Sequence, residues 1–166
     1  LFGKILLLGT INKFVLLLLY MSYKGIYRPS NPKKYKGDQS NIIYRSLWER
    51  KFMNYCDLNE NIIEWASEEF WIPYLDPTTN RVRRYFPDFF IKYKDKENNI
   101  RRSVIEVKPM RETLEPKATK GKSRKTLINE SVTYVKNQAK WKAAKEFCAD
   151  RKLEFKIMTE KELGIR

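Results

Sequence analysis

Three runs rich in β-branched and aromatic residues lie close together in the middle of the sequence. They are IIEWASEEFWIPYL at 62–75, RVRRYFPDFFIKYK at 81–94 and RRSVIEVKP at 101–109. Two clusters of turn-forming residues separate them, DPTTN at 76–80 and DKENN at 95–99. Strand-like runs divided by such short turns are typical of antiparallel hairpins. The spacing therefore predicts a three-stranded meander in which each run forms one strand.

Helical periodicity flanks this meander on both sides. Residues 40–57 place apolar side chains on one helical face, namely Tyr44, Leu47, Trp48, Phe52 and Tyr55. Residues 129–152 form a second helical pattern, with an apolar face of Val132, Val135, Ala139, Trp141, Ala143, Phe147 and Cys148. Residues 153–159 predict a final strand, and residues 160–165 predict a last helical turn. We therefore expect an α/β fold with a mixed central sheet, in the order helix, three-stranded meander, helix, strand.

The charge of the chain indicates a polyanionic partner. The formal net charge is +14 and the pI is about 9.7, so nucleic acid is the first candidate and an acidic membrane surface the second. The chain has no histidine, which excludes Ser-His-Asp and Cys-His catalysis and any histidine base. The two cysteines, Cys56 and Cys148, show no CxxC spacing, so we expect reduced thiols inside the core.

Composition divides the chain into three parts. Residues 1–20, LFGKILLLGTINKFVLLLLY, contain no acid and no proline, whereas Met21 opens a polar stretch that resembles a natural protein start. We expect 1–20 to be translated upstream sequence that is not native to the protein; a membrane anchor and a core helix are the alternatives. Residues 21–40 predict a basic N-terminal arm. Residues 41–166 predict the folded domain, which includes a basic loop at 110–128.

One acid stands where acids are disfavoured. Asp88 lies inside an aromatic strand-like run, where aspartate is costly to bury. Glu106 and Lys108, in the next run, share one face of a strand because they are two residues apart. If the two runs pair, two carboxylates repel each other and a divalent cation removes the conflict. Oxygen ligands favour Mg²⁺, with Mn²⁺ as a substitute, and such a cation activates water and phosphate. The cluster therefore predicts phosphodiester hydrolysis.

Pro87-Asp88 followed by Glu106-Val107-Lys108 resembles the signature of the PD-(D/E)xK nucleases. More narrowly, YRSLWERKFMNYCD, SEEFWIPY, RYFPDF and VIEVKP resemble the T4-type phage head completion nucleases, which are related to the N-terminal catalytic domain of TnsA transposition endonucleases. The resemblance covers about residues 22–160 and implies a restriction-endonuclease-like core.

The resemblance also implies roles for single residues. Glu49, on the helix before the meander, would hold metal together with Asp88 and Glu106. The carbonyl group of Val107 would add a ligand, and Lys108 would assist catalysis. On the second helix, Gln138 and Lys140 are implied as contacts to DNA or to the active site.

Each candidate residue also has a purely structural interpretation. Asp88 could pair with Arg83 or Arg84 at a strand end, and Glu106 with Lys108 could form a solvent-facing ion pair on an edge strand. Ser46-x-x-Glu49 fits a helix capping box, which would leave Glu49 no role in a metal site.

The basic loop at 110–128 has two interpretations as well. It is either a solvated charged loop or a clamp for the phosphates of double-stranded DNA. The candidate clamp residues are Lys117, Lys120, Lys122, Arg124 and Lys125. No pattern for reading bases is present in the sequence.

The acidic cluster predicts Mg²⁺-dependent hydrolysis of nucleic acid, and the resemblance implies an endodeoxyribonuclease of phage head completion that acts at or near packaged DNA ends. We expect it in the host cytoplasm during phage assembly, with the virion as a second location. Phage head or neck proteins are its expected partners, and we expect no small-molecule cofactor and no membrane. The alternatives are a TnsA-like transposition endonuclease or junction resolvase, and a non-catalytic DNA-binding protein of the head or neck.

Overall fold

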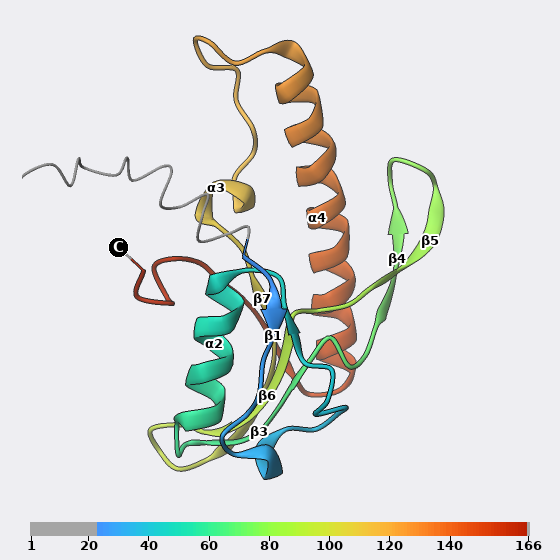
Figure 1. Cartoon of the computed structure of the whole chain (residues 1–166). Coiled ribbons are helices and arrows are strands. Elements are labelled where there is room, and N and C mark those ends of the chain that lie inside the picture. Colours follow the sequence, from blue (N-terminus) through green and yellow to red (C-terminus); the bar gives the residue numbers. More distant parts are fainter. Residues whose placement is uncertain (1–22, 166) are drawn as a thin grey trace, which may run out of the picture.

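The computed structural model describes residues 23–165 and is built around a four-stranded mixed sheet (Figure 1). Its strands are β3 (Ile62–Ser67), β6 (Phe89–Lys94), β7 (Ile100–Val107) and β8 (Glu154–Met158), in that spatial order. β3, β6 and β7 are antiparallel neighbours, whereas β8 pairs with β7 in parallel. The α/β class, the mixed sheet and the order of its elements are therefore confirmed.

The first two runs of the meander each form two strands instead of one. β4 (Ile72–Asp76) and β5 (Arg81–Tyr85) pair as a separate two-stranded ribbon. The predicted hairpin is present, but it bends where Glu68 adopts a left-handed φ of 53° and where Pro87 offers no backbone donor. The prediction of two unbroken strands was wrong because these local conformations interrupt the pairing.

Helix α2 (Leu47–Leu58) covers one face of the sheet (Figure 1). Its buried apolar side chains are Trp48, Phe52, Met53 and Cys56. Two residues of the predicted face lie elsewhere: Tyr44 belongs to β2 (Ile43–Tyr44), and Tyr55 is 51% exposed. The helix begins later than expected because the Oγ of Ser46 accepts a hydrogen bond from the backbone N–H of Glu49 and caps the helix there.

Helix α4 (Arg124–Asp150) lies on the opposite side of the sheet from α2 (Figure 1). It begins five residues earlier than predicted, capped by Ser123, whose Oγ accepts a hydrogen bond from the N–H of Thr126. Its C-terminal half buries Trp141, Ala144 and Cys148.

The apolar face predicted for this second helix was partly wrong. Val132 and Val135 are 40% and 44% exposed, because the N-terminal half of α4 extends beyond the sheet together with the loop that precedes it (Figure 1). Residues 160–164 form hydrogen-bonded turns, not the predicted last turn of helix. Both cysteines are free and buried, as expected.

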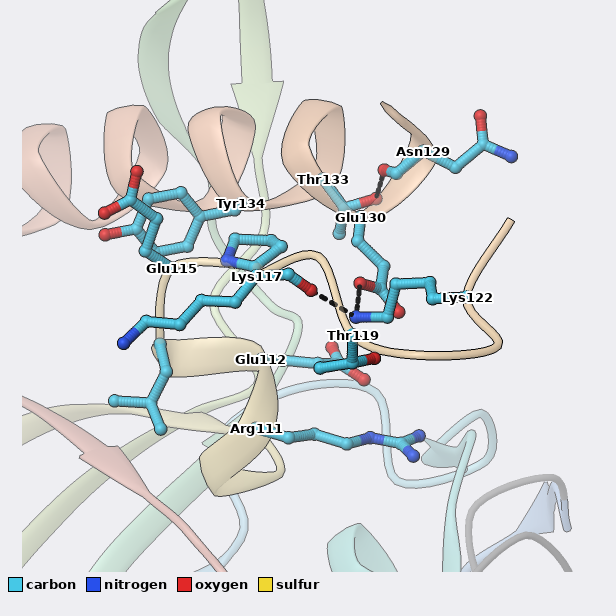
Figure 2. A pocket seen from close by; sticks show the side chains of 12 residues that line it. Arg111, Glu112, Glu115, Lys117, Thr119, Lys122, Asn129, Glu130, Thr133 and Tyr134 are labelled. Carbon is cyan, nitrogen blue, oxygen red and sulfur yellow. Dashed lines mark hydrogen bonds and ion pairs between the residues drawn. The ribbon is translucent and has the colours of Figure 1, made fainter. Parts of the chain in front are cut away.

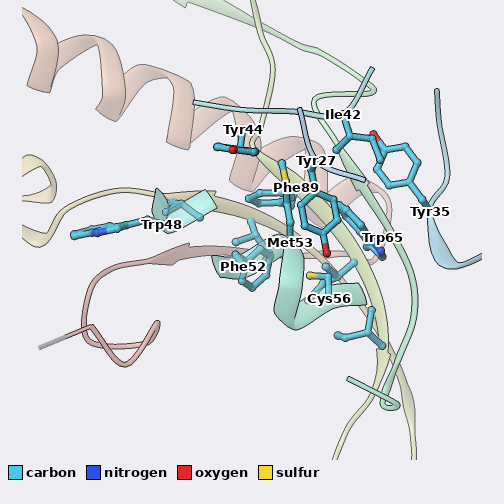
Figure 3. Packing of buried hydrophobic residues seen from close by; sticks show 14 of the residues in the cluster. Tyr27, Tyr35, Ile42, Tyr44, Trp48, Phe52, Met53, Cys56, Trp65 and Phe89 are labelled. Carbon is cyan, nitrogen blue, oxygen red and sulfur yellow. The ribbon is translucent and has the colours of Figure 1, made fainter. Parts of the chain in front are cut away.

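The segment predicted as a basic arm contributes side chains to the core. It contains β1 (Gly25–Ile26), which pairs with β2, and the short 3₁₀ helix η1 (Pro32–Lys34). Its tyrosines Tyr27 and Tyr35 pack against Trp65 in the main apolar cluster (Figure 3). The prediction made for residues 1–20 lies outside the described residues.

A buried carboxylate attaches this segment to α2. Asp57 accepts hydrogen bonds from the backbone N–H groups of Ser30 and Asn31, at 2.7 and 3.0 Å, and one from the hydroxyl of Tyr27 at 3.3 Å. The bonds satisfy an acid that is fully removed from solvent.

Within residues 23–165, no helix has the length and apolarity that a membrane crossing requires.

Candidate active site

Asp88 lies at the bend between the two halves of the long hairpin, immediately before β6. The sequence placed it in the middle of a strand, which was wrong because β5 ends at Tyr85. Its Oδ2 accepts a hydrogen bond of 2.7 Å from the backbone N–H of Val107. This bond fixes the carboxylate at the end of β7, next to Glu106.

Glu106 and Lys108 form the second part of the cluster, at the C-terminal end of β7. The Nζ of Lys108 lies 3.3 Å from Oε1 of Glu106, and Glu106 is 3% exposed. β7 is an inner strand, paired with β6 on one side and β8 on the other. The interpretation as a solvent-facing pair on an edge strand is therefore wrong.

The alternative partners proposed for Asp88 are engaged elsewhere. Arg83 forms an ion pair with Asp76 at 3.2 Å, and the guanidinium group of Arg84 lies over the ring of Trp71, 4.9 Å from its centroid. Asp88 instead faces Glu106, Lys108 and the backbone of Val107.

The charges in the cluster influence one another strongly. Burial, and then repulsion from Glu106, raise the pKa of Asp88 well above its usual value, against the opposing attraction of Lys108. Burial lowers the pKa of Lys108, but the attraction of Glu106 and Asp88 outweighs it, so this pKa is raised overall. The ammonium group of Lys108 therefore stays protonated beside two carboxylates, Glu106 and Asp88, which repel each other.

Glu49 is committed to the cap of α2. Its Oε2 accepts a 2.7 Å hydrogen bond from the N–H of Arg45, and its Oε1 accepts one of 2.9 Å from the Oγ of Ser46. Burial is the main cause that raises the pKa of Glu49, and the attraction of Lys108 is among those that lower it. The carboxylate thus caps the helix, and it also lies within the electrostatic reach of the site.

Tyr85 is a site residue that the sequence did not point to. Its hydroxyl donates a 2.6 Å hydrogen bond to Oε2 of Glu106, so β5 supports a carboxylate of the central sheet. The signal available in the sequence was its position three residues before Asp88. That signal is weak, because only the bend after β5 turns Tyr85 toward Glu106.

Helix α4 brings one of its two candidate residues to the site. The Nζ of Lys140 lies over the rings of Tyr74 and Tyr85, 5.8 and 5.7 Å from their centroids. Burial lowers its pKa, while Glu106 and Asp88 act in the opposite direction. Gln138 is exposed, whereas the neighbouring Asn137 is buried, 5% exposed, on the same helix. Lys140 is therefore placed next to the cluster.

The basic loop, together with α3 (Met110–Thr113) and α4, surrounds a cavity of about 960 Å³ (Figure 2). Lys122 holds this loop to the helix: its Nζ lies 2.8 Å from Oε2 of Glu130 and donates to the carbonyl of Lys117 at 3.1 Å (Figure 2). The side chains of Lys117, Lys120, Arg124 and Lys125 are exposed, the last two in the first turn of α4. Four of the five candidate clamp residues are thus accessible, and the fifth stabilises the loop.

In the described part of the chain, no three acidic or thiol side chains converge as a preformed metal site. The two carboxylates that do lie together are those of Asp88 and Glu106.

Comparison with known proteins agrees with this geometry. The model of the family described as TnsA-like endonuclease N terminal matches residues 59–160, which include the bend, β6, β7 and all of α4. The head completion nuclease of Enterobacteria phage T4 is 38% identical over 143 residues, which is 84% of this chain and 93% of that protein. Because both matches extend over most of the folded domain, the chain belongs to the TnsA-like endonuclease family and is a nuclease.

Proposed function

We propose that the protein is a metal-dependent DNA endonuclease of the PD-(D/E)xK type. The observation that carries this proposal is the cluster of Asp88, Glu106 and Lys108 at the ends of β6 and β7. Two carboxylates and one lysine, held by neighbouring strands, supply metal-binding oxygens beside a cationic group. Phosphodiester hydrolysis needs both, because charge builds up on the phosphate in the transition state.

Mg²⁺ is the cation that this donor set suits, with Mn²⁺ as a substitute. The carboxylates of Asp88 and Glu106 would hold it, with the carbonyl of Val107 and the carboxylate of Glu49 as further donors. When bound, the metal would polarise the phosphate and lower the pKa of a water. The chain's own groups position this chemistry: Tyr85 orients Glu106, and the Nζ of Lys108 supplies positive charge to the developing phosphorane.

Double-stranded DNA is the proposed substrate. A formal charge of +14 and the accessible side chains of Lys117, Lys120, Arg124 and Lys125 support contacts to the phosphate backbone. Lys140, beside the carboxylates, would contact the strand being cut.

The biological setting that we propose is completion of a phage head, with cleavage at or near the ends of packaged DNA. The similarity to the T4 head completion nuclease supports this setting. We place the protein in the host cytoplasm during assembly, with head or neck proteins as partners. A TnsA-like role in transposition is the second candidate, which the family match favours.

A cleavage assay with the full chain tests the proposal. Linear, circular and branched DNA are incubated with Mg²⁺ or with EDTA, using wild type, Asp88→Asn and Lys108→Ala. We expect wild type to cut DNA only with Mg²⁺, and each variant to be folded and at least 100-fold slower, on the order expected for loss of a group that stabilises transition-state charge. Cleavage that persists in EDTA, or at the wild-type rate in both variants, would overturn the assignment.

The same assay distinguishes the two biological settings. Cutting confined to linear ends or branches favours a role in packaging. Cutting of closed circular DNA at a defined sequence favours the transposition setting.

A further inference from the structure

The ribbon of β4 and β5 has one face packed against the body of the protein and one face in solvent. Ile72, Tyr74 and Tyr85 point inward, where they pack with Ala144 of α4. The alternate residues point outward because neighbouring side chains of a strand lie on opposite faces. The outer face therefore carries Trp71, Pro73, Leu75, Val82, Arg84 and Phe86, all of them exposed.

Two aromatic side chains stand at the end of this outer face that is nearest to the carboxylates. Trp71 and Phe86 are 45% and 44% exposed, and they flank the last residue pair of the ribbon, Ile72 with Tyr85. Phe86 precedes Asp88 by two residues, and Tyr85 beside it contacts Glu106. The aromatic pair is thus at the end of the ribbon where the chain continues to Asp88 and the proposed reaction centre.

The charge of the ribbon selects the kind of ligand. Asp76 is the one acid between residues 71 and 86, and it is buried in ion pairs with Arg83 and with Lys136 of α4, at 3.2 and 3.6 Å. On the outer face, the guanidinium group of Arg84 lies over the ring of Trp71. A surface of aromatic rings and a cation without any acid complements a polyanion that has flat apolar groups. Pairing of this face with the same face of a second copy is disfavoured, because both faces carry the same positive charge.

We propose that the outer face of the β4–β5 ribbon binds unpaired nucleobases of the DNA substrate. Bases of a single-stranded stretch stack on Trp71 and Phe86, while Arg84 contacts the adjoining phosphate. Bases inside a duplex stack on one another and leave no face for these rings. The inference rests on the proposed nuclease function and specifies its substrate: DNA with an overhang, flap or branch next to the scissile bond.

Tryptophan fluorescence provides a direct test. The chain has four tryptophans, and three of them, Trp48, Trp65 and Trp141, are at most 3% exposed. Emission that acrylamide quenches therefore reports on Trp71. The full chain is titrated in EDTA with a duplex that carries a single-stranded overhang and with a blunt duplex of the same length. We expect the overhang DNA to quench this emission and to protect it from acrylamide, and we expect little change with the blunt duplex.

Other occupants of the surface would give different results. If both duplexes change the Trp71 emission equally, or if neither changes it, the proposal is overturned. The outer face would then be a surface for a protein partner. Protection from acrylamide that rises with protein concentration in the absence of DNA would assign the face to a second copy of the chain.

Binding by variants completes the test. Trp71→Ala and Phe86→Ala are each expected to weaken binding of the overhang DNA by roughly 5- to 100-fold, the range for loss of one stacked base. Trp71→Phe should restore most of the affinity, because it keeps a ring. Tyr55→Ala, which removes a 51% exposed aromatic of α2, is the matched control and should bind like wild type.

The cleavage assay separates a failure of this inference from a failure of the nuclease proposal. If Trp71→Ala binds and cuts overhang DNA like wild type, the proposal of base stacking on the ribbon fails, whereas the proposal of nuclease activity stands. If wild type cuts no DNA at all, the nuclease proposal fails, whatever the fluorescence shows.

Discussion

The hydroxyl of Tyr85 donates a 2.6 Å hydrogen bond to Oε2 of Glu106, which joins the β4–β5 ribbon to the central sheet at the candidate active site. Burial, and then the charge of Glu106, raise the pKa of Tyr85, so the phenol remains a donor at neutral pH. Lys108 lies at the other oxygen of the same carboxylate. Glu106 is therefore oriented from two sides, which suits the role of metal ligand that we propose for it.

Replacing Tyr85 with phenylalanine tests this support. The ring stays in the core, but one oxygen of Glu106 loses its donor. We expect the Mg²⁺ concentration for half-maximal cleavage to rise about 10- to 100-fold, as for loss of an outer hydrogen-bond partner of a metal ligand. Titration of cleavage rate against Mg²⁺ measures this change.

A second tyrosine provides the control for this substitution. Tyr74 lies on the same inner face of the ribbon and also under Lys140. Tyr74→Phe should leave the Mg²⁺ dependence unchanged. An equal shift in both variants would mean that the ribbon acts through packing and not through the hydrogen bond to Glu106.

Glu49 can be tested apart from its role as a cap. Glutamine at this position keeps an oxygen that accepts from the N–H of Arg45 or from Ser46, so Glu49→Gln should cost less than about 1 kcal/mol of unfolding free energy. We nevertheless expect slower Mg²⁺-dependent cleavage, because the carboxylate and Lys108 interact electrostatically. Thermal unfolding and cleavage are measured on the same sample. A folded variant with full activity would show that Glu49 only caps α2.

The lysines of the basic loop should separate into two kinds. Lys120 is exposed, so Lys120→Ala should weaken DNA binding and lower the slope of log K against log salt by about 1. Lys122 pairs with Glu130, so Lys122→Ala should make the loop easier to cleave with trypsin. Binding titrations at several salt concentrations and limited proteolysis measure the two effects. The prediction fails if Lys122→Ala leaves proteolysis unchanged.

The lowered pKa of Asp76 predicts that the folded protein loses stability in acid. The hydrogen bond from Thr78 is the main cause that lowers its pKa from 3.8 to about 2, and Lys136 adds to it. A lowered pKa means that the native state binds the proton less readily than the unfolded state. The stabilisation is therefore complete above pH 4 and is lost as the pH falls toward 2.

Denaturant unfolding from pH 5 to pH 2 measures this loss. The difference in unfolding free energy between wild type and Asp76→Asn should shrink as the pH falls. Thr78→Val removes the hydroxyl donor but keeps the acid, so its loss of stability should begin at a higher pH. A difference between wild type and Asp76→Asn that stays constant over this range would contradict the assigned pKa.

Local sequence patterns predicted the elements that depend on near neighbours. The turns at 76–80 and 95–99, the strand that ends at Val107 and the final strand are where the sequence placed them. Turn side chains accept hydrogen bonds from backbone N–H groups a few residues further along the chain, as Asp76 does from Thr78 and Asp95 from Asn99, so short-range chemistry determines these positions. The same patterns gave the order of the elements, and hence the α/β class.

Contacts between distant segments decided the rest. Val132 and Val135 look like core residues, but they are exposed because α4 extends past the sheet that would have covered them. The position of Glu49 in the sequence fits both a helix cap and a metal ligand. In the structure, its carboxylate oxygens accept hydrogen bonds from the N–H of Arg45 and the Oγ of Ser46. Residue spacing in the sequence shows neither the exposure of these valines nor the contacts of Glu49, since both depend on which segments the fold places next to the side chain.

The sequence by itself determined that Glu106 and Lys108 share a face, because the two-residue period of a strand requires it. It also determined that an acid at position 88 would need a partner. Only the tertiary structure decided what that partner is. The bend at Phe86–Asp88 lets β5 leave the sheet, which turns Tyr85 toward Glu106 and brings Asp88 to the N–H of Val107. Pro87 at the bend can be read from the sequence, but the residues that the bend meets are set by the pairing of β6 with β7, so its consequences for the site are not encoded in any short stretch of sequence.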